Sequence, residues 1–156
     1  MFTIDETHRQ ILLQWAYENK SRFTSNGFGR QYGILQQLNG PPCWHEVKAS
    51  VVRQFLLSPM WKEEPCFQDY IGYITEGGAI HPHTDPNQPG YQHVRFNCLL
   101  SKPESGGDRI YGDRIIPLPQ EGGVWRCDAG RVTHASTPVI GITARIVLSL
   151  GFLLPI

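Results

Sequence analysis

The N-terminal third of the chain carries two stretches in which apolar residues recur with a helical period. Thr3 and Glu6 have the spacing of a capping box, which predicts a helix over residues 5–20. The apolar residues that would share one stripe of this helix are Ile11, Leu12, Trp15 and Ala16. A second stripe, formed by Val47, Val51 and Phe55, predicts a helix over residues 45–57 that ends before Pro59.

The segment between the two predicted helices has no such period. Residues 24–42 are interrupted by Gly27, Gly29, Gly33, Gly40, Pro41 and Pro42. Glycine and proline at this density are typical of turns and loops. We therefore expect a long loop here, with one short strand near Tyr32–Leu35.

From residue 70 onward the pattern changes to short β-prone runs separated by turns. The predicted strands are Tyr70–Thr75, Ile80–Thr84, His93–Leu100, Arg109–Leu118, Val124–Asp128, Arg131–Thr133 and Ile142–Leu153. Such strands after two helices predict a mainly β fold, a jelly roll (double-stranded β-helix) with two N-terminal helices against one sheet. At 156 residues the chain is expected to form one domain, with a helical part at 1–66 and a jelly-roll core at 67–156.

The amino-acid composition limits which binding partners and which cellular compartment we expect for this protein. The formal net charge is zero, which disfavours binding to a nucleic-acid backbone. No apolar run is long enough for a membrane span, and the N-terminus lacks the features of a signal peptide. The four cysteines have no CxxC spacing, so we expect free thiols in a reducing compartment, and hence a cytoplasmic protein of undetermined oligomeric state.

Three residues in the β-patterned region have the chemistry of a metal site. His83 and Asp85 are two positions apart, so on an extended chain their side chains point the same way. His134 can supply a third ligand from a distant segment. Two imidazoles and one carboxylate are the ligand set of mononuclear non-haem Fe(II), which keeps open positions for O₂ and substrate.

Arg145 adds a second feature, because it stands at the head of the apolar strand predicted near the C-terminus. A buried arginine is costly without an anionic partner. A dicarboxylate cosubstrate would supply that partner through bidentate pairing with the guanidinium.

The combination of His83, Asp85, His134 and Arg145 resembles the Fe(II)/2-oxoglutarate-dependent dioxygenases, which are jelly-roll enzymes, over residues 68–154. A finer similarity is to the aspartyl/asparaginyl β-hydroxylase-like branch, on the run Val94-Arg95-Phe96-Asn97 and on Gly122-Gly123-Val124-Trp125. The retained Asp85 makes the chain look more like the free-proline and prolyl hydroxylases.

The resemblance implies specific roles. Fe(II) would be bound by His83, Asp85 and His134, and Arg145 would hold the distal carboxylate of 2-oxoglutarate. Arg95 and Asn97 would hold the C1-carboxylate end of that cosubstrate, and Tyr73 would pair with the Arg145 site. The expected reaction is hydroxylation of an unactivated C–H bond with release of succinate and CO₂. A carboxylate ligand disfavours halogenation, whereas desaturation and ring formation use the same ligands.

One alternative is a cupin-like metal-binding domain without oxygenase activity. His81 and His83 have the HxH spacing of cupins, but no glutamate follows at the expected place. The substrate stays open among amino acids, small peptides, peptidyl side chains and natural-product intermediates. Arg109, Tyr111 and Arg114 are further candidates for contact with a substrate carboxylate.

Overall fold

The computed structural model describes residues 1–156, and its central feature is one large antiparallel sheet with helices on one side. The helices are α1 (Glu6–Asn19), the 3₁₀ helix η1 (Lys20–Arg22), α2 (Leu35–Leu38) and α3 (Cys43–Gln54). The strands are β1 (Thr24–Gly27), β2 (Arg30–Ile34), β3 (Lys62–Glu63), β4 (Tyr70–Ile74), β5 (Tyr91–Ser101), β6 (Ser105–Gly106), β7 (Arg109–Tyr111), β8 (Arg114–Ile116), β9 (Val124–Cys127), β10 (His134–Ser136), β11 (Val139–Ile140) and β12 (Arg145–Pro155).

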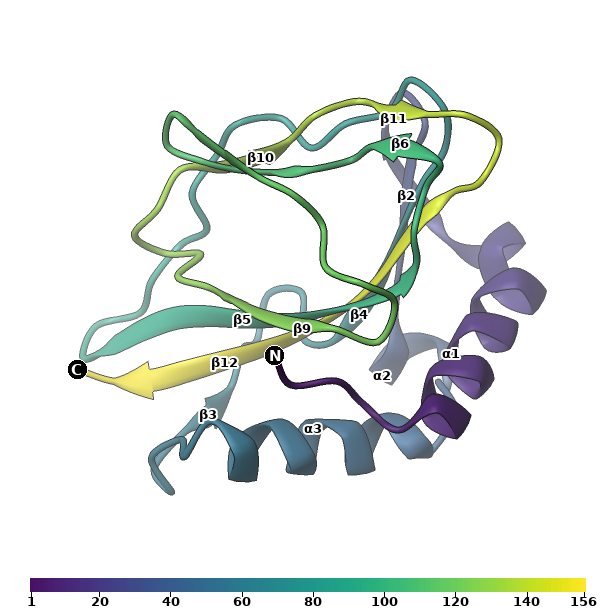
Figure 1. Ribbon diagram of the computed structural model, residues 1–156. Coiled ribbons are helices and arrows are strands. Elements are labelled where there is room, and N and C mark those ends of the chain that lie inside the picture. Colours follow the sequence, from purple (N-terminus) through teal and green to yellow (C-terminus); the bar gives the residue numbers. More distant parts are fainter.

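The strands form three sheets. The main sheet has the order β1-β2-β4-β12-β5-β9, with β3 paired to β12. The small sheets have the orders β10-β7-β8 and β11-β6. Figure 1 shows α1 and α3 on one side of the main sheet and the strands β6, β10 and β11 on the other. The expectation of a mainly β fold with helices against one sheet is confirmed, and no helix is long and apolar enough to cross a membrane.

Side chains alternate along β5 between the two faces of the main sheet. Phe96, Cys98 and Leu100 are buried in the core that the sheet shares with α1 and α3. Arg95 and Asn97 face the opposite side, where they line a pocket. The helices therefore supply the core that keeps the sheet in place, and the other face is available for polar groups.

The start of α1 differs from the predicted capping box. Asp5 is the N-cap, and its carboxylate accepts hydrogen bonds from the amides of Thr7 and His8. Thr3 instead forms a β-bridge with Gly123, so it cannot cap the helix. Leu12 is fully buried, but Ile11 of the predicted stripe is 43% exposed. The second helix starts at Cys43, earlier than predicted.

The short strand expected near Tyr32–Leu35 is present as β2, but the loop predicted around it is wrong, because residues 24–42 also contain β1, which forms a hairpin with β2, and the short helix α2. Gly27 and Gly29 adopt positive φ angles at the turn of this hairpin, so these glycines enable strand pairing where we expected them to prevent it. Since β2 pairs with β4, the proposed division at residue 66 into a helical part and a sheet part is also wrong.

Several strand predictions need correction. Residues 80–84 form no regular strand, and residues 131–133 precede β10 in a turn. The predicted strand at 109–118 is the hairpin β7–β8, because a turn at Gly112 interrupts it. The two-residue strands β3, β6 and β11 are too short to give a sequence pattern.

A buried ion pair joins α3 to the sheet. Lys48 donates to both carboxylate oxygens of Asp69, at 2.9 and 3.1 Å, and to the carbonyl of Gly151. Both side chains are almost fully buried. Removal of one partner would leave the other charge desolvated and without its counter-charge.

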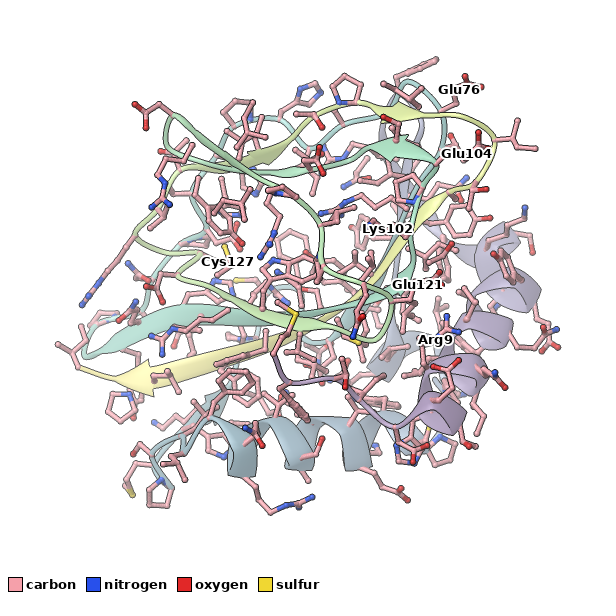
Figure 2. All side chains as sticks on the ribbon, viewed as in Figure 1. Arg9, Glu76, Lys102, Glu104, Glu121 and Cys127 are labelled. Carbon is pink, nitrogen blue, oxygen red and sulfur yellow. The ribbon has the colours of Figure 1, made fainter.

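We expect Lys48→Met to lower the free energy of unfolding by about 3–5 kcal/mol, because Asp69 would stay buried without a cation. Urea denaturation measures the change. Lys102→Met is the matched control, since Lys102 is exposed just after β5 (Figure 2). A loss as small as that of the control would show that the pair does not anchor α3.

Candidate functional site

A pocket lies on the face of the main sheet that the helices leave free. Its empty volume is about 1020 Å³, its open mouth included. Side chains from β2, β4, β5 and β12 line it on the sheet side, and side chains from β7, β10 and the 80–85 segment line it on the other. Pockets of this size accommodate small organic ligands.

His83 and His134 are placed opposite each other by the backbone. The amide of His134 donates to the carbonyl of His83 at 2.9 Å, and the reverse bond measures 3.2 Å. This isolated antiparallel bridge brings the two rings to a centroid distance of 4.3 Å. The amide of Asp85 bonds to the carbonyl of Ala129, which continues the contact between the same two segments.

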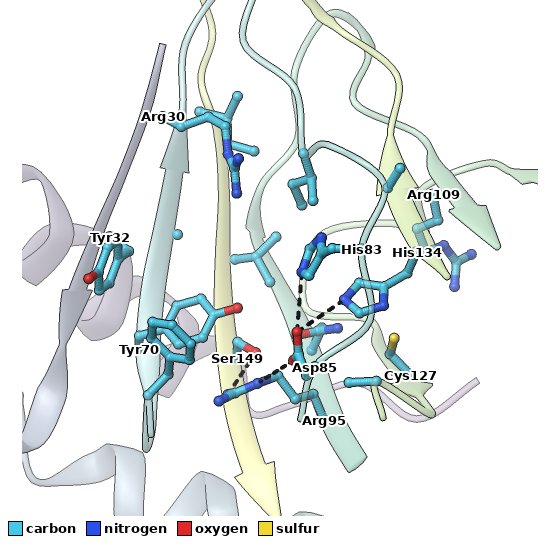
Figure 3. A pocket seen from close by; sticks show the side chains of 18 of the residues that line it. Arg30, Tyr32, Tyr70, His83, Asp85, Arg95, Arg109, Cys127, His134 and Ser149 are labelled. Atoms are coloured by element: carbon cyan, nitrogen blue, oxygen red, sulfur yellow. Dashed lines mark hydrogen bonds and ion pairs between the residues drawn. The ribbon is translucent and has the colours of Figure 1, made fainter. Parts of the chain in front are cut away.

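Asp85 completes a three-residue cluster. Its Oδ1 atom lies 3.2 Å from Nε2 of His83 and 3.8 Å from Nε2 of His134 (Figure 3). One ligand atom from each residue lies within 4.8 Å of the others. The structure therefore brings together the three residues that the sequence singled out, although residues 80–84 are not a regular strand.

The second nitrogen of each ring determines which nitrogen faces the cluster. Nδ1 of His83 lies 2.7 Å from the carbonyl of His81, and Nδ1 of His134 lies 2.9 Å from that of Val132. A ring that donates from Nδ1 keeps the lone pair on Nε2, which is the arrangement of a metal-binding histidine. His81 itself contributes only its carbonyl, and its imidazole is outside the cluster.

The charges in the cluster favour an ionised Asp85. Burial alone would raise the pKa of Asp85, but the contact with His83 and the positive charge of Arg95 outweigh it and leave the pKa below its ordinary value. Burial lowers the pKa of His134, whereas the contact with Asp85 raises the pKa of His83. A divalent cation requires an ionised carboxylate and unprotonated imidazole nitrogens, so its binding would release any proton that His83 carries on Nε2.

Two buried donors behind Asp85 have no hydrogen-bond partner. Nδ1 of His93 lies 3.8 Å from Oδ2 of Asp85, and Nε of Arg95 lies 3.7 Å from the same oxygen. Both distances exceed a hydrogen bond, and both atoms lack any other partner. A small shift of the carboxylate would satisfy both donors, and it would leave Oδ1 free to bind a cation. The pattern of apolar residues gave no indication of this role for His93.

Arg145 is the most unusual charge in the pocket. It is 5% exposed, its single hydrogen bond runs from Nε to the carbonyl of Gly107, and no carboxylate lies within ion-pair distance. Burial lowers the pKa of Arg145 to about 10, so the guanidinium still carries its charge at neutral pH. Arg145 therefore stays a candidate for binding an anion, because a buried guanidinium without a counter-charge is costly.

Tyr73 does not share this site, and that expectation is wrong. Its side chain belongs to the core between the sheet and the helices, and its ring lies 6.3 Å from that of Tyr17. The register of β4 instead points Tyr70 into the pocket. Tyr111 also faces the pocket from β7, and its buried hydroxyl has no hydrogen-bond partner.

Arg95 and Asn97 lie on the pocket wall as predicted, but Arg95 already has a counter-charge. Its Nη2 atom lies 2.8 Å from Oε2 of Glu64, and its Nη1 atom donates to Ser149 and to the carbonyl of Gln68. Glu64 is buried and also accepts from the amides of residues 66–68. Arg95 is therefore better placed to hold Asp85 than to attract a free carboxylate.

No family model matches this chain, and no curated protein matches it. Solved structures do match over nearly its whole length. The viral collagen prolyl hydroxylase of Paramecium bursaria Chlorella virus-1, solved as a 2-oxoglutarate complex, is 13% identical with a TM-score of 0.67, over 98% of this chain and 92% of that one. The prolyl-4-hydroxylase of Pseudomonas putida is 13% identical with a TM-score of 0.70, over 99% and 89%.

The non-haem α-ketoglutarate-dependent epimerase SnoN of nogalamycin biosynthesis is 14% identical with a TM-score of 0.72, over 97% of this chain and 74% of that one. Likenesses at this identity establish the fold. The resemblance indicated by the sequence motifs is thus confirmed at that level, because the chain has the fold of 2-oxoglutarate- and iron-dependent oxygenases.

We expect His93→Leu to weaken the binding of a divalent cation about 10–100-fold, because Asp85 would lose a donor that orients it. His93→Asn retains an amide donor near the position of Nδ1 and should keep most of the affinity. Titration with Co(II), followed by absorbance, measures both variants, and circular dichroism checks their folding. Equal affinity in His93→Leu and wild type would exclude the positioning role.

Proposed function

We propose that the protein is an Fe(II)- and 2-oxoglutarate-dependent oxygenase that hydroxylates an unactivated C–H bond. The observation that carries this proposal is a buried Arg145 without an acidic partner in the same pocket as His83, Asp85 and His134. One feature fits a metal, and the other fits the far end of a dicarboxylate. The shared fold of the solved oxygenases supports the combination.

The donor set fits Fe(II). His83 and His134 each present Nε2, and Asp85 presents Oδ1, so three ligand atoms converge from one side. This arrangement leaves the other side of the cation open. When bound, iron and 2-oxoglutarate together supply the oxidising power that places an oxygen atom from O₂ on the substrate and releases succinate and CO₂.

The remaining roles belong to the pocket walls. Arg145 would pair with the distal carboxylate of 2-oxoglutarate, and the hydroxyl of Tyr111 is available as a further donor to it. Asn97 would contact the keto-acid end. The buried side chains of Trp125 and Val147 give the same pocket part of its apolar lining.

Hydroxylation is the proposed outcome because Asp85 fills the ligand position that a halide would need. The cupin-like alternative is not favoured, because His81 does not reach the cluster. We also propose a double-stranded β-helix as the detailed description of the fold, with the main sheet facing the small sheets. The substrate would be an amino acid, a peptide or a small natural product.

We propose a cytoplasmic location. All four cysteines are free, and Cys98 and Cys127 are buried, as expected for thiols in a reducing compartment. Burial raises the pKa of Cys98 to about 12 and that of Cys127 to about 11, so neither thiol is reactive at neutral pH.

Substitution of Arg145 tests the cosubstrate site. Arg145→Leu should weaken 2-oxoglutarate binding by about 2–5 kcal/mol, because the distal carboxylate would lose its desolvated cation. Iron affinity should be unchanged, since Arg145 is not a ligand. Anaerobic calorimetry measures both. Arg114→Leu is the control, because Arg114 is exposed outside the pocket. Unchanged 2-oxoglutarate affinity in Arg145→Leu would remove Arg145 from the site.

The reaction itself is tested by succinate production across a panel of amino acids, peptides and small organic acids. With the best substrate, we expect a product with one added oxygen that carries label from ¹⁸O₂, and no chlorinated product in high chloride. Mass spectrometry distinguishes these outcomes. An unlabelled product, or chlorination, would contradict hydroxylation at an iron bound by Asp85.

A further inference from the structure

The side chains that line the pocket carry a net positive charge, and binding of the proposed metal together with its cosubstrate would not neutralise it. Four of its lining residues are cationic, namely Arg30, Arg95, Arg109 and Arg145, whereas Asp85 is its only lining carboxylate. Glu64 compensates Arg95 from behind the wall. Bound Fe(II) and the 2-oxoglutarate dianion cancel each other in charge, so the loaded pocket would keep a net positive charge that a further anion could balance.

Arg30 is the cation best placed to meet that anion. It extends from β2 into the upper part of the pocket, on the side of His83 that faces away from Asp85 (Figure 3). It forms no ion pair with a carboxylate, and it lines the same pocket as His83. Burial lowers the pKa of Arg30, although its side chain is only partly enclosed. Arg109 is less available, because it donates to the carbonyl of Pro117 and stacks on Trp125 at 5.0 Å.

An aromatic surface adjoins Arg30. Tyr32 lies two positions further along the same strand, and it contacts Phe67 and Tyr70 edge-to-face at centroid distances of 6.0 and 6.1 Å. Phe67 and Tyr70 also contact each other, at 6.4 Å. All three rings line the pocket, and Phe67 is 40% exposed. A partly exposed aromatic cluster of this kind binds the apolar body of a ligand.

Resting on the proposed function, we propose that the primary substrate is an organic acid whose carboxylate pairs with Arg30 and whose apolar body lies against Tyr32, Phe67 and Tyr70. The carboxylate and the apolar body would then fix the orientation of the substrate beside the open side of the His83, Asp85 and His134 cluster. This subsite is separate from the Arg145 site, which takes the cosubstrate.

A pair of probes that differ mainly in charge tests this subsite. The protein is loaded anaerobically with Ni(II) and 2-oxoglutarate, and the binding of 3-phenylpropanoate and 3-phenylpropanamide is measured by calorimetry. We expect the acid to bind at least about 10-fold tighter than the amide, because a hydrogen bond to a charged partner is worth more than a neutral one. Arg30→Gln should remove this preference, Arg30→Lys should keep part of it, and Arg114→Gln should leave it unchanged.

Equal binding of acid and amide to the wild type would overturn the proposal. It would also be overturned if Arg30→Gln lost 2-oxoglutarate affinity, because Arg30 would then belong to the cosubstrate site. Titration of Ni(II) and 2-oxoglutarate into the wild type tests the proposed function independently of the Arg30 subsite. If neither Ni(II) nor 2-oxoglutarate bound, but binding of 3-phenylpropanoate still required Arg30, the oxygenase proposal would be wrong and the carboxylate subsite would be retained.

Discussion

The antiparallel bridge between His83 and His134 is the contact on which the candidate site depends. Its two backbone hydrogen bonds join the 83–85 segment to the start of β10, which lies far away in the chain. The bridge places both imidazoles on one side, and the alternation of an extended chain then directs Asp85 toward them. Each ring is held by a second hydrogen bond to a carbonyl two residues earlier, so its orientation does not depend on a bound ligand.

Around this bridge the molecule separates structural charges from functional ones. Lys48 and Asp69 pair with each other on the helix side, and Arg95 pairs with Glu64 beneath the pocket. Arg145, by contrast, has no acidic partner. Because burial of an unpaired charge is costly, we propose that Arg145 is neutralised when an anion binds in the pocket. The apolar core between the helices and the main sheet stabilises the sheet, and this offsets the free-energy cost of burying Arg145.

The sequence predicted that His83, Asp85 and His134 come together, whereas it predicted the bounds of the surrounding elements less well. The spacing of His83 and Asp85 depends only on local geometry, and Arg145 stands out because a charge interrupts an apolar strand. Tyr73 was assigned to the wrong face, since the period of a strand fixes which residues share a face but not which face is buried by helices. The β1–β2 hairpin was missed because its glycines are equally frequent in loops. His93 was missed because only the structure shows that its buried ring nitrogen has no hydrogen-bond partner.

Cosubstrate binding with and without iron tests the central claim most directly. We predict that anaerobic titration of 2-oxoglutarate into the wild-type protein shows one tight site when Fe(II) is present. The affinity should fall sharply when Fe(II) is omitted, because the cation and Arg145 hold opposite ends of the same molecule. Equal affinity in the presence and absence of Fe(II), or no binding in either case, would contradict the account of a shared metal and cosubstrate pocket.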